Sequence, residues 1–199
     1  NWIYSEDNIT IILPSVEKVA DLTGKKPGDL IEIEGKDLYL VKSVEMPNGD
    51  EVEFTVTQEE ESETLSFNLP DNMTDGAIVM LPASEVKVTV ATIGMALPSE
   101  VTATPSTELR GGDQITITGI NMELVTDIEF PGVDDAVAPD SQSPTELTVT
   151  MPTDATSGNI LLNTGSGTSV EVAIETLKPV FDSYKSSTVS LGADVIING

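Results

Sequence analysis

One short pattern recurs along this chain and restricts its fold more than any other feature. The sequence GDLIEIEG at residues 28–35 returns as GDQITITG at 112–119 and as GADVIING at 192–199. A proline precedes each copy at a nearly constant distance, at Pro14, Pro98 and Pro179. The repeat period, which is the separation of Gly28, Gly112 and Gly192, is longer than the roughly 20 to 50 residues of solenoid repeats. Each copy is therefore expected to be a small domain with its own core.

The repeat divides the chain into modules that meet at the prolines. We expect residues 15–98 and 99–179 to be two complete modules. Residues 1–14 are expected to be the end of a preceding module or an N-terminal strand, and residues 180–199 the first strands of a truncated third module. On this interpretation the chain is a piece of a longer protein.

Apolar residues within each copy alternate with polar ones, which is typical of a half-buried β-strand. Ile31 and Ile33 lie between glutamates, and Ile115 and Ile117 between threonines. In the first module this pattern predicts strands at residues 16–21, 30–34, 42–46, 52–57, 64–68, 77–81 and 86–91. Turn sequences at 47–50 and 165–167 predict hairpins. The predicted fold is all-β, with tandem immunoglobulin-like sandwiches of about seven strands each.

The composition excludes several classes of function. The chain has 34 acidic and 9 basic residues and a net charge of −25, which repels nucleic-acid phosphates. Histidine and cysteine are both absent, which removes the commonest general base and all thiolate chemistry. No apolar run approaches the roughly 20 residues that cross a bilayer. We therefore expect no enzyme, no nucleic-acid partner and no membrane-spanning segment.

The repeated strand, its leading proline and the later Leu-Pro or Met-Pro followed by Gly together resemble the IPT/TIG family of immunoglobulin-like domains, of E-set type. The resemblance covers residues 15–199 and is clearest over 99–179. Tandem modules of this kind resemble spacer portions of Bacteroidetes surface lipoproteins that serve polysaccharide utilisation. The resemblance implies an extracellular, cell-surface location, as an outer-membrane lipoprotein. It also implies a partner, a polysaccharide or surface protein, bound by regions outside this chain.

Acidic loops are the candidates for a metal or a catalytic site. Asp134, Asp135 and Asp140 could supply oxygen ligands to Ca²⁺, as could Asp71 and Asp75. No Asp-x-Asp-x-Asp-Gly loop is present, so a solvated loop is the competing interpretation. As an adjacent carboxylate pair, Asp134 and Asp135 also raise the possibility of glycoside hydrolysis, but adjacent residues on a loop do not face each other across a sugar. We expect no cofactor other than possible Ca²⁺, and no catalytic residue.

Aromatic side chains that could stack on a sugar are few. Phe54, Phe67 and Phe130 fall on strand positions that favour the core, whereas Tyr39 follows the turn at Gly35 and could either pack or contact a ligand. Tyr39 is thus the candidate ligand residue. The leading hypothesis is a monomeric, non-catalytic spacer that presents a distal, glycan-binding domain. The alternative is a module that itself binds carbohydrate or protein, as an adhesin does.

Overall fold

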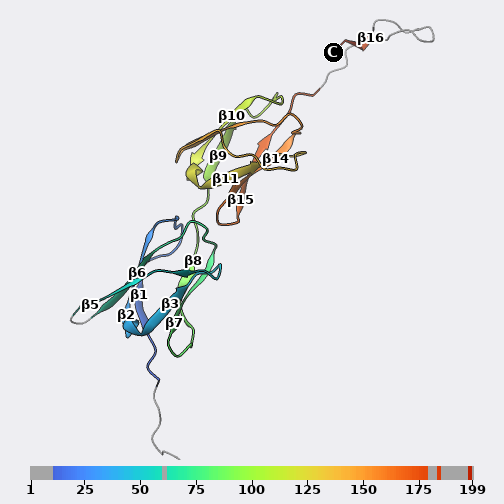
Figure 1. Ribbon diagram of the computed structural model, residues 1–199. Coiled ribbons are helices and arrows are strands. Elements are labelled where there is room, and N and C mark those ends of the chain that lie inside the picture. The colour runs from blue at the N-terminus through green and yellow to red at the C-terminus, as the bar shows by residue number, and fades with distance from the viewer. Residues whose placement is uncertain (1–10, 60–61, 179–182, 185–196, 199) are drawn as a thin grey trace, which may run out of the picture. The chain divides into compact units, whose positions relative to one another are not determined.

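The computed structural model describes residues 11–59, 62–178, 183–184 and 197–198 (Figure 1). Two hydrophobic cores are present, one built from residues between Leu22 and Ile93 and the other from residues between Ala103 and Ile174. Of the expected third module, β16 (Ser183–Tyr184) pairs antiparallel with β17 (Ile197–Asn198), which lies within the third copy of the repeat. The rest of that module and the first ten residues of the element expected at 1–14 lie outside the described residues, whereas residues 11–14 form no strand. The expected module boundaries stay predictions.

The first sandwich, called module 1 here, has two antiparallel sheets. One sheet has the order β1 (Ser15–Val19), β2 (Leu30–Lys36), β6 (Glu63–Asn68) and β5 (Thr55–Gln58). The other has the order β4 (Glu51–Val52), β3 (Val41–Glu45), β7 (Gly76–Pro82) and β8 (Val88–Ile93). These orders match the A-B-E-D and C′-C-F-G sheets of an immunoglobulin sandwich.

Module 2 repeats the design with one strand fewer. Its first sheet has the order β12 (Ser141–Gln142), β13 (Glu146–Thr150), β10 (Gln114–Ile120) and β9 (Ser99–Thr104). The second has the order β11 (Val125–Glu129), β14 (Gly158–Thr164) and β15 (Ser169–Ile174). The chain therefore contains tandem immunoglobulin-like sandwiches, as the sequence predicted.

The alternation in the repeated strand becomes the two sides of a sheet. Ile31 and Ile33 point into the core of module 1, and Ile115 and Ile117 into that of module 2, all at most 1% exposed. Phe67 and Phe130 are buried and Phe54 is partly buried against the core of module 1, which confirms that all three belong to the cores, although Phe54 and Phe130 lie just outside the strands. Burying such a side chain contributes roughly 1.5 to 3 kcal/mol. Each module is thus stabilised mainly by its own core.

The glycine at the end of the repeated strand lies beside a shift in strand register, as predicted, but does not itself supply the positive φ. A glycine at the end of a strand predicts either a bulge or a positive φ. The pairing with the first strand does shift register beside Gly35 and Gly119. The positive φ falls two residues later, on Asp37 and Asn121, at 57° and 60°. A Cβ on Gly35 would meet the carbonyl oxygen of Ser15 at 2.1 Å. The glycine is required because the first strand of the sandwich passes close to it.

After this glycine each module turns through a short 3₁₀ helix, Leu38–Leu40 in module 1 and Met122–Leu124 in module 2. Leu38 and Met122 are fully buried in their cores. The turn at 47–50 joins β3 to β4, and that at 165–167 joins β14 to β15, so both predicted hairpins are confirmed. The single strand predicted at 52–57 is wrong, because the chain leaves one sheet after β4 and joins the other at β5.

Candidate functional site

The candidate calcium ligands do not gather into a cluster. Asp134 and Asp135 are exposed in the loop after β11, whereas the Asp140 Oδ2 accepts a hydrogen bond from the Thr150 Oγ1 at 2.8 Å. Within the described ranges, no group of three or more acidic side chains has an arrangement that could hold a metal ion. This hydrogen bond attaches the loop that contains Asp140 to the end of β13. Calcium binding by these residues stays a prediction.

The second pair of candidate ligands separates in the same way. Asp71 is exposed in the loop after β6. Asp75, four residues along the same loop, accepts a hydrogen bond through its Oδ1 from the backbone N–H of Met95 at 2.7 Å. This carboxylate therefore fixes the chain that leaves module 1.

That departing chain, residues 94–96, is called the exit segment of module 1. Three backbone hydrogen bonds attach it to the loop between β1 and β2. Gly94 donates to the Leu22 carbonyl at 2.9 Å, Lys25 donates to the Gly94 carbonyl at 3.0 Å, and Ala96 donates to the Lys25 carbonyl at 2.7 Å. Together they form a parallel bridge between Lys25 and Met95. The exit segment is thus held to its own module up to Ala96.

Module 2 holds its exit segment, residues 175–177, by the same set of bonds. Glu175 donates to the Ser106 carbonyl at 2.8 Å, and a parallel bridge joins Leu109 to Thr176. The place of Asp75 is taken by Ser157, whose Oγ accepts a hydrogen bond from the Thr176 N–H at 2.8 Å. The repeat therefore preserves a hydrogen-bond acceptor at this position although the residue type changes.

Only Leu97 and Pro98 stand between the first exit segment and β9, which begins at Ser99. Proline restricts its own φ to about −65° and also restricts the residue before it. The connection between the two modules is therefore short and has few freely rotating bonds. The sequence had marked Pro98 as a joint, but nothing in the local pattern revealed the bonds at Asp75 and Lys25.

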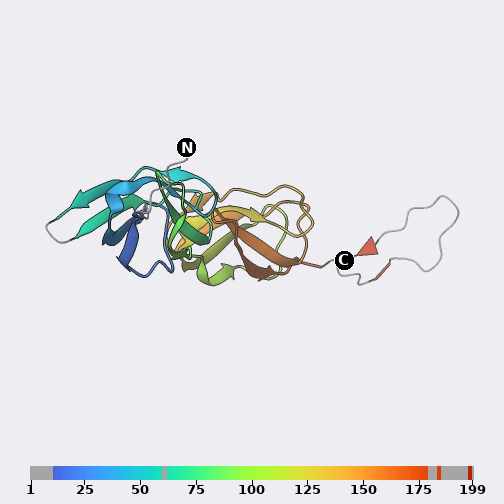
Figure 2. The same cartoon turned by 90° about the horizontal axis from the view of Figure 1, so that it is seen from below.

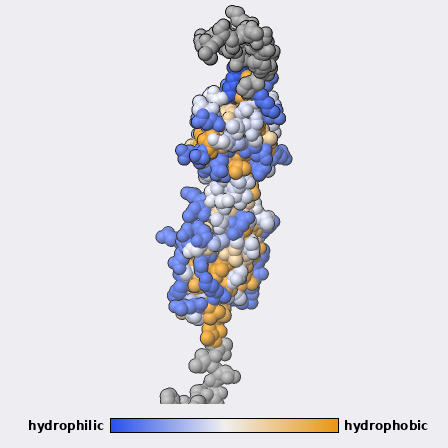
Figure 3. Space-filling view, turned by 90° about the vertical axis from the view of Figure 1, so that its right-hand side faces the viewer, coloured by the Kyte–Doolittle hydropathy of each residue, from blue (hydrophilic) through white to orange (hydrophobic). Residues whose placement is uncertain are grey.

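Tyr39 lies at the end of module 1 where β1 begins. Its side chain is 53% exposed, whereas Leu38 beside it is fully buried. Tyr39 lines a hollow of about 330 Å³ together with Ile12, Leu40, Lys42, Pro82, Ala83 and Ser84. On the face drawn in Figure 3, hydrophobic residues are visible at the lower end of this module. The structure therefore leaves the Tyr39 ring accessible to a ligand.

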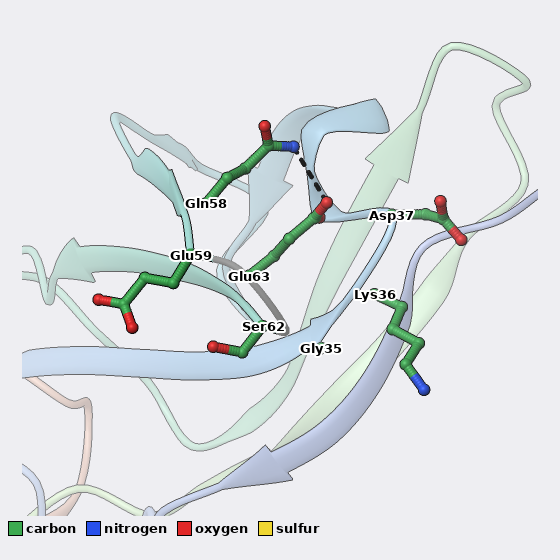
Figure 4. A pocket seen from close by; sticks show the side chains of 7 residues that line it. All are labelled: Gly35, Lys36, Asp37, Gln58, Glu59, Ser62 and Glu63. Carbon is green, nitrogen blue, oxygen red and sulfur yellow. Dashed lines mark hydrogen bonds between the residues drawn. The ribbon is translucent and has the colours of Figure 1, made fainter.

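A second hollow, of about 410 Å³, lies between β2 and the hairpin of β5 and β6 (Figure 4). The Glu63 Oε2 accepts hydrogen bonds from the backbone N–H groups of Leu38 and Tyr39 at 2.5 and 3.4 Å, and its Oε1 accepts one from the Gln58 Nε2 at 3.0 Å. Glu63 thus stabilises the start of the 3₁₀ helix. In module 2 the Pro144 carbonyl accepts the equivalent hydrogen bond, from Met122 at 3.0 Å.

Lys36 also lines this hollow, but its ammonium group forms an ion pair with Glu17. The Lys36 Nζ lies 2.6 Å from the Glu17 Oε1. The hydrogen bond to Glu17, and then the charge of that carboxylate, raise the pKa of Lys36 above its usual value. Both side chains are largely exposed, so the ion pair contributes little to stability. The hollow is lined mainly by polar residues, and the charged groups of Lys36 and Glu63 are engaged in structural contacts.

Comparison with known proteins gives likenesses at the level of fold. No protein-family model matches the chain, and no curated protein matches it. Among solved structures, it is similar to the surface glycan-binding protein SGBP-B of the Bacteroides ovatus mixed-linkage glucan utilisation locus, solved in complex with a heptasaccharide. The identity is 22%, the TM-score is 0.35, and the match covers 81% of this chain and 45% of that one.

Two further structures illustrate the range. The surface glycan-binding protein PbSGBP-B of Prevotella bryantii is 19% identical with a TM-score of 0.39, over 82% of this chain and 42% of that one. The ICAM-5 D1–D4 ectodomain fragment is 14% identical with a TM-score of 0.29, and the match covers 85% of this chain and 48% of that one. The chain thus spans less than half the length of each of these three proteins.

Among the residues that the structure describes, no helix has the length and apolar character needed to cross a bilayer.

Proposed function

We propose that this chain is a non-catalytic spacer in a bacterial cell-surface protein, which presents a distal polysaccharide-binding region. The observation that carries the proposal is the attachment of each exit segment to its own module. In module 1, Met95 bonds to Asp75 and Ala96 bonds to Lys25, which leaves Leu97 and Pro98 as the connection to β9. A connection of this kind limits the directions in which the next module can point. A spacer requires its modules to keep a restricted range of orientations, because a flexible linker would let the distal region fold back.

The family, the location and the ligand class of this proposal come from the sequence. The Gly-Asp-x-Ile-x-Ile-x-Gly strand and its leading proline resemble IPT/TIG modules of Bacteroidetes surface lipoproteins. The immunoglobulin strand order of both sandwiches is the one that this resemblance requires. We therefore propose an extracellular, lipid-anchored protein of that family, whose partner is a polysaccharide or a surface protein.

Labelling one dye site in each module and measuring single-molecule energy transfer tests the spacer function. The wild-type chain is expected to give one narrow distance distribution. The double variant Asp75→Ala and Pro98→Gly, which frees the exit segment and the joint, is expected to broaden it. An equally broad distribution in both proteins contradicts the proposal.

The accessible ring of Tyr39 favours one alternative, direct binding of a carbohydrate by module 1. An aromatic face beside a hydroxyl and an ammonium group, here those of Ser84 and Lys42, suits a pyranose ring. Calorimetric titration of the chain with a panel of soluble plant and microbial polysaccharides distinguishes the two functions. The spacer predicts no heat of binding, whereas binding that Tyr39→Ala abolishes supports the alternative.

A further inference from the structure

The strand β5 forms an open edge of module 1. It ends the sheet β1-β2-β6-β5, and among the described residues it pairs with β6 alone. The hairpin of β5 and β6 projects from the body of the module in both views (Figures 1 and 2). An exposed edge strand of this kind offers unpaired backbone groups to another extended chain.

The register identifies which backbone groups are offered. At the end of the hairpin, Glu59 N–H donates to the Ser62 carbonyl at 2.9 Å. Because hydrogen-bonded and non-bonded pairs alternate along an antiparallel ladder, the next bonded pairs are Thr57 with Thr64 and Thr55 with Ser66. The N–H and C=O groups of Val56 and Gln58 therefore point away from β6, toward the open edge.

Module 2 closes the same edge. Its edge strand β12 consists of Ser141 and Gln142 alone, with Pro139 and Pro144 close on either side. The Gln142 side chain turns inward, where its Nε2 donates to the carbonyls of Met122 and Val125 at 2.8 and 2.7 Å. Prolines and short strands are the usual means of blocking an edge. The edge is therefore accessible in module 1 and blocked in module 2, although the two modules share one fold. The accessible edge is a property of the module 1 sequence.

Charge indicates what kind of chain the edge accepts. Residues 51–63 include Glu51, Glu53, Glu63 and a run of three glutamates at 59–61, and contain no lysine or arginine. An antiparallel pairing of two β5 strands from two copies of this protein would place the glutamates of one copy beside those of the other, which is unfavourable. The strand β5 itself is uncharged, and a basic extended segment would instead meet opposite charge at its two ends, beside Glu53 and Glu59.

We propose that the β5 edge of module 1 binds an extended, lysine- or arginine-rich peptide segment of another protein, which adds to the sheet as a fifth strand. The outward N–H and C=O groups of Val56 and Gln58 supply the ladder hydrogen bonds. The exposed side chains of Glu53 and Glu59, one near each end of β5, supply the attraction and select basic sequences. This interaction is independent of the spacer function and of the Tyr39 hollow.

A matched pair of variants at position 58 tests the proposal. Gln58→Pro removes the outward N–H and keeps every backbone hydrogen bond between β5 and β6, because that N–H does not point at β6. It also removes the side-chain hydrogen bond from Gln58 to Glu63. Gln58→Ala removes the same side chain and keeps the N–H. The probe is a short, end-blocked, fluorescent peptide that alternates lysine with valine, and its binding to the full chain is followed by anisotropy. A peptide that alternates lysine with proline carries the same charge but cannot add as a strand.

The wild-type chain and Gln58→Ala are expected to bind the lysine–valine peptide with similar affinity, and added salt is expected to weaken both. Gln58→Pro is expected to bind roughly tenfold more weakly, with circular dichroism showing that it is folded. Equal binding to Gln58→Pro, or equal binding of the lysine–proline peptide, would mean that charge alone acts and would overturn the proposal. Absence of saturable binding would overturn it too, as would loss of the edge through dimerisation of the chain, seen by sedimentation.

Discussion

The Asp75 carboxylate accepts the backbone N–H of Met95 at 2.7 Å, and Ser157 does the same for Thr176 in the next module. These two pairs occupy the same place in the repeat. Each pair fixes the segment that leaves its sandwich. The acceptor matters more than the residue type, since a carboxylate and a hydroxyl both satisfy the donor.

Replacing Asp75 by alanine is expected to lower the unfolding free energy of module 1 by about 1 kcal/mol, since one partly exposed hydrogen bond is lost. Amide hydrogen exchange at Met95 should speed up, which a change elsewhere in the core would not cause. The control is Asp71→Ala, in an exposed part of the same loop. Urea denaturation and hydrogen exchange measure both effects, and identical exchange in the two variants contradicts the role of Asp75.

Gly35→Ala is expected to destabilise module 1 by about 2 kcal/mol or more, because the new Cβ would lie 2.1 Å from the Ser15 carbonyl oxygen and force β1 away. Gly94→Ala is the matched control. A Cβ there would meet only the Thr23 Cα at 3.9 Å, an ordinary contact. Chemical denaturation of both variants checks this, and a small effect at Gly35 would show that β1 can give way.

Adjacent residues in the 3₁₀ helix of module 1 should respond differently to truncation. Leu38→Ala is expected to cost about 2 to 5 kcal/mol, since Leu38 is fully buried, whereas Tyr39→Ala should change stability by less than about 0.5 kcal/mol. Thermal denaturation of the two variants measures the difference. A large cost at Tyr39 would show that its ring packs in solution and is not available to a ligand.

The carboxyl group of Asp21 is expected to titrate below its usual pKa. The backbone N–H of Thr23, and then its hydroxyl, donate to the Asp21 carboxylate at 3.0 and 2.9 Å and stabilise its charged form. A lowered pKa means that the contribution of Asp21 to stability is present above its unfolded pKa, near 4, and is lost as the pH falls through its folded value. NMR titration of the side-chain carbon measures it.

Thr23→Val separates the two donors in that titration. It removes the hydroxyl and keeps the N–H, so the pKa of Asp21 should rise only part of the way back. A pKa of Asp21 that does not change in this variant would show that the hydroxyl bond does not form in solution.

Calcium should leave the protein unchanged if Asp134 and Asp135 are solvated. The melting temperature is expected to be the same in millimolar Ca²⁺ and in chelator, because ligand binding would raise it. If calcium raises the melting temperature and Asp134→Asn with Asp135→Asn removes the increase, the sequence-based prediction of a Ca²⁺ site is correct.

Much of the fold follows from the chain pattern. The predicted strands at 30–34, 42–46, 64–68 and 77–81 correspond to β2, β3, β6 and β7, because the alternation that defines a half-buried strand is local. The hairpin at 47–50 was predictable for the same reason. The candidate sites were predicted less well. Tyr39 is exposed, as one of its two interpretations required, but the role of Asp75 could not be found from its own neighbours in the sequence.

The sequence by itself determined that this protein consists of tandem sandwiches. Its strands alternate at period two and no segment sustains helical spacing, so the isoleucines of the repeated strand can be buried only against another sheet. Only the tertiary structure decided that residues 52–57 divide between two sheets, that Gly35 makes room for Ser15, and that Asp75 holds Met95. Each of these depends on which segments meet across a module. Such contacts are set by packing between residues far apart in the chain, and the local pattern of polar and apolar residues does not encode them.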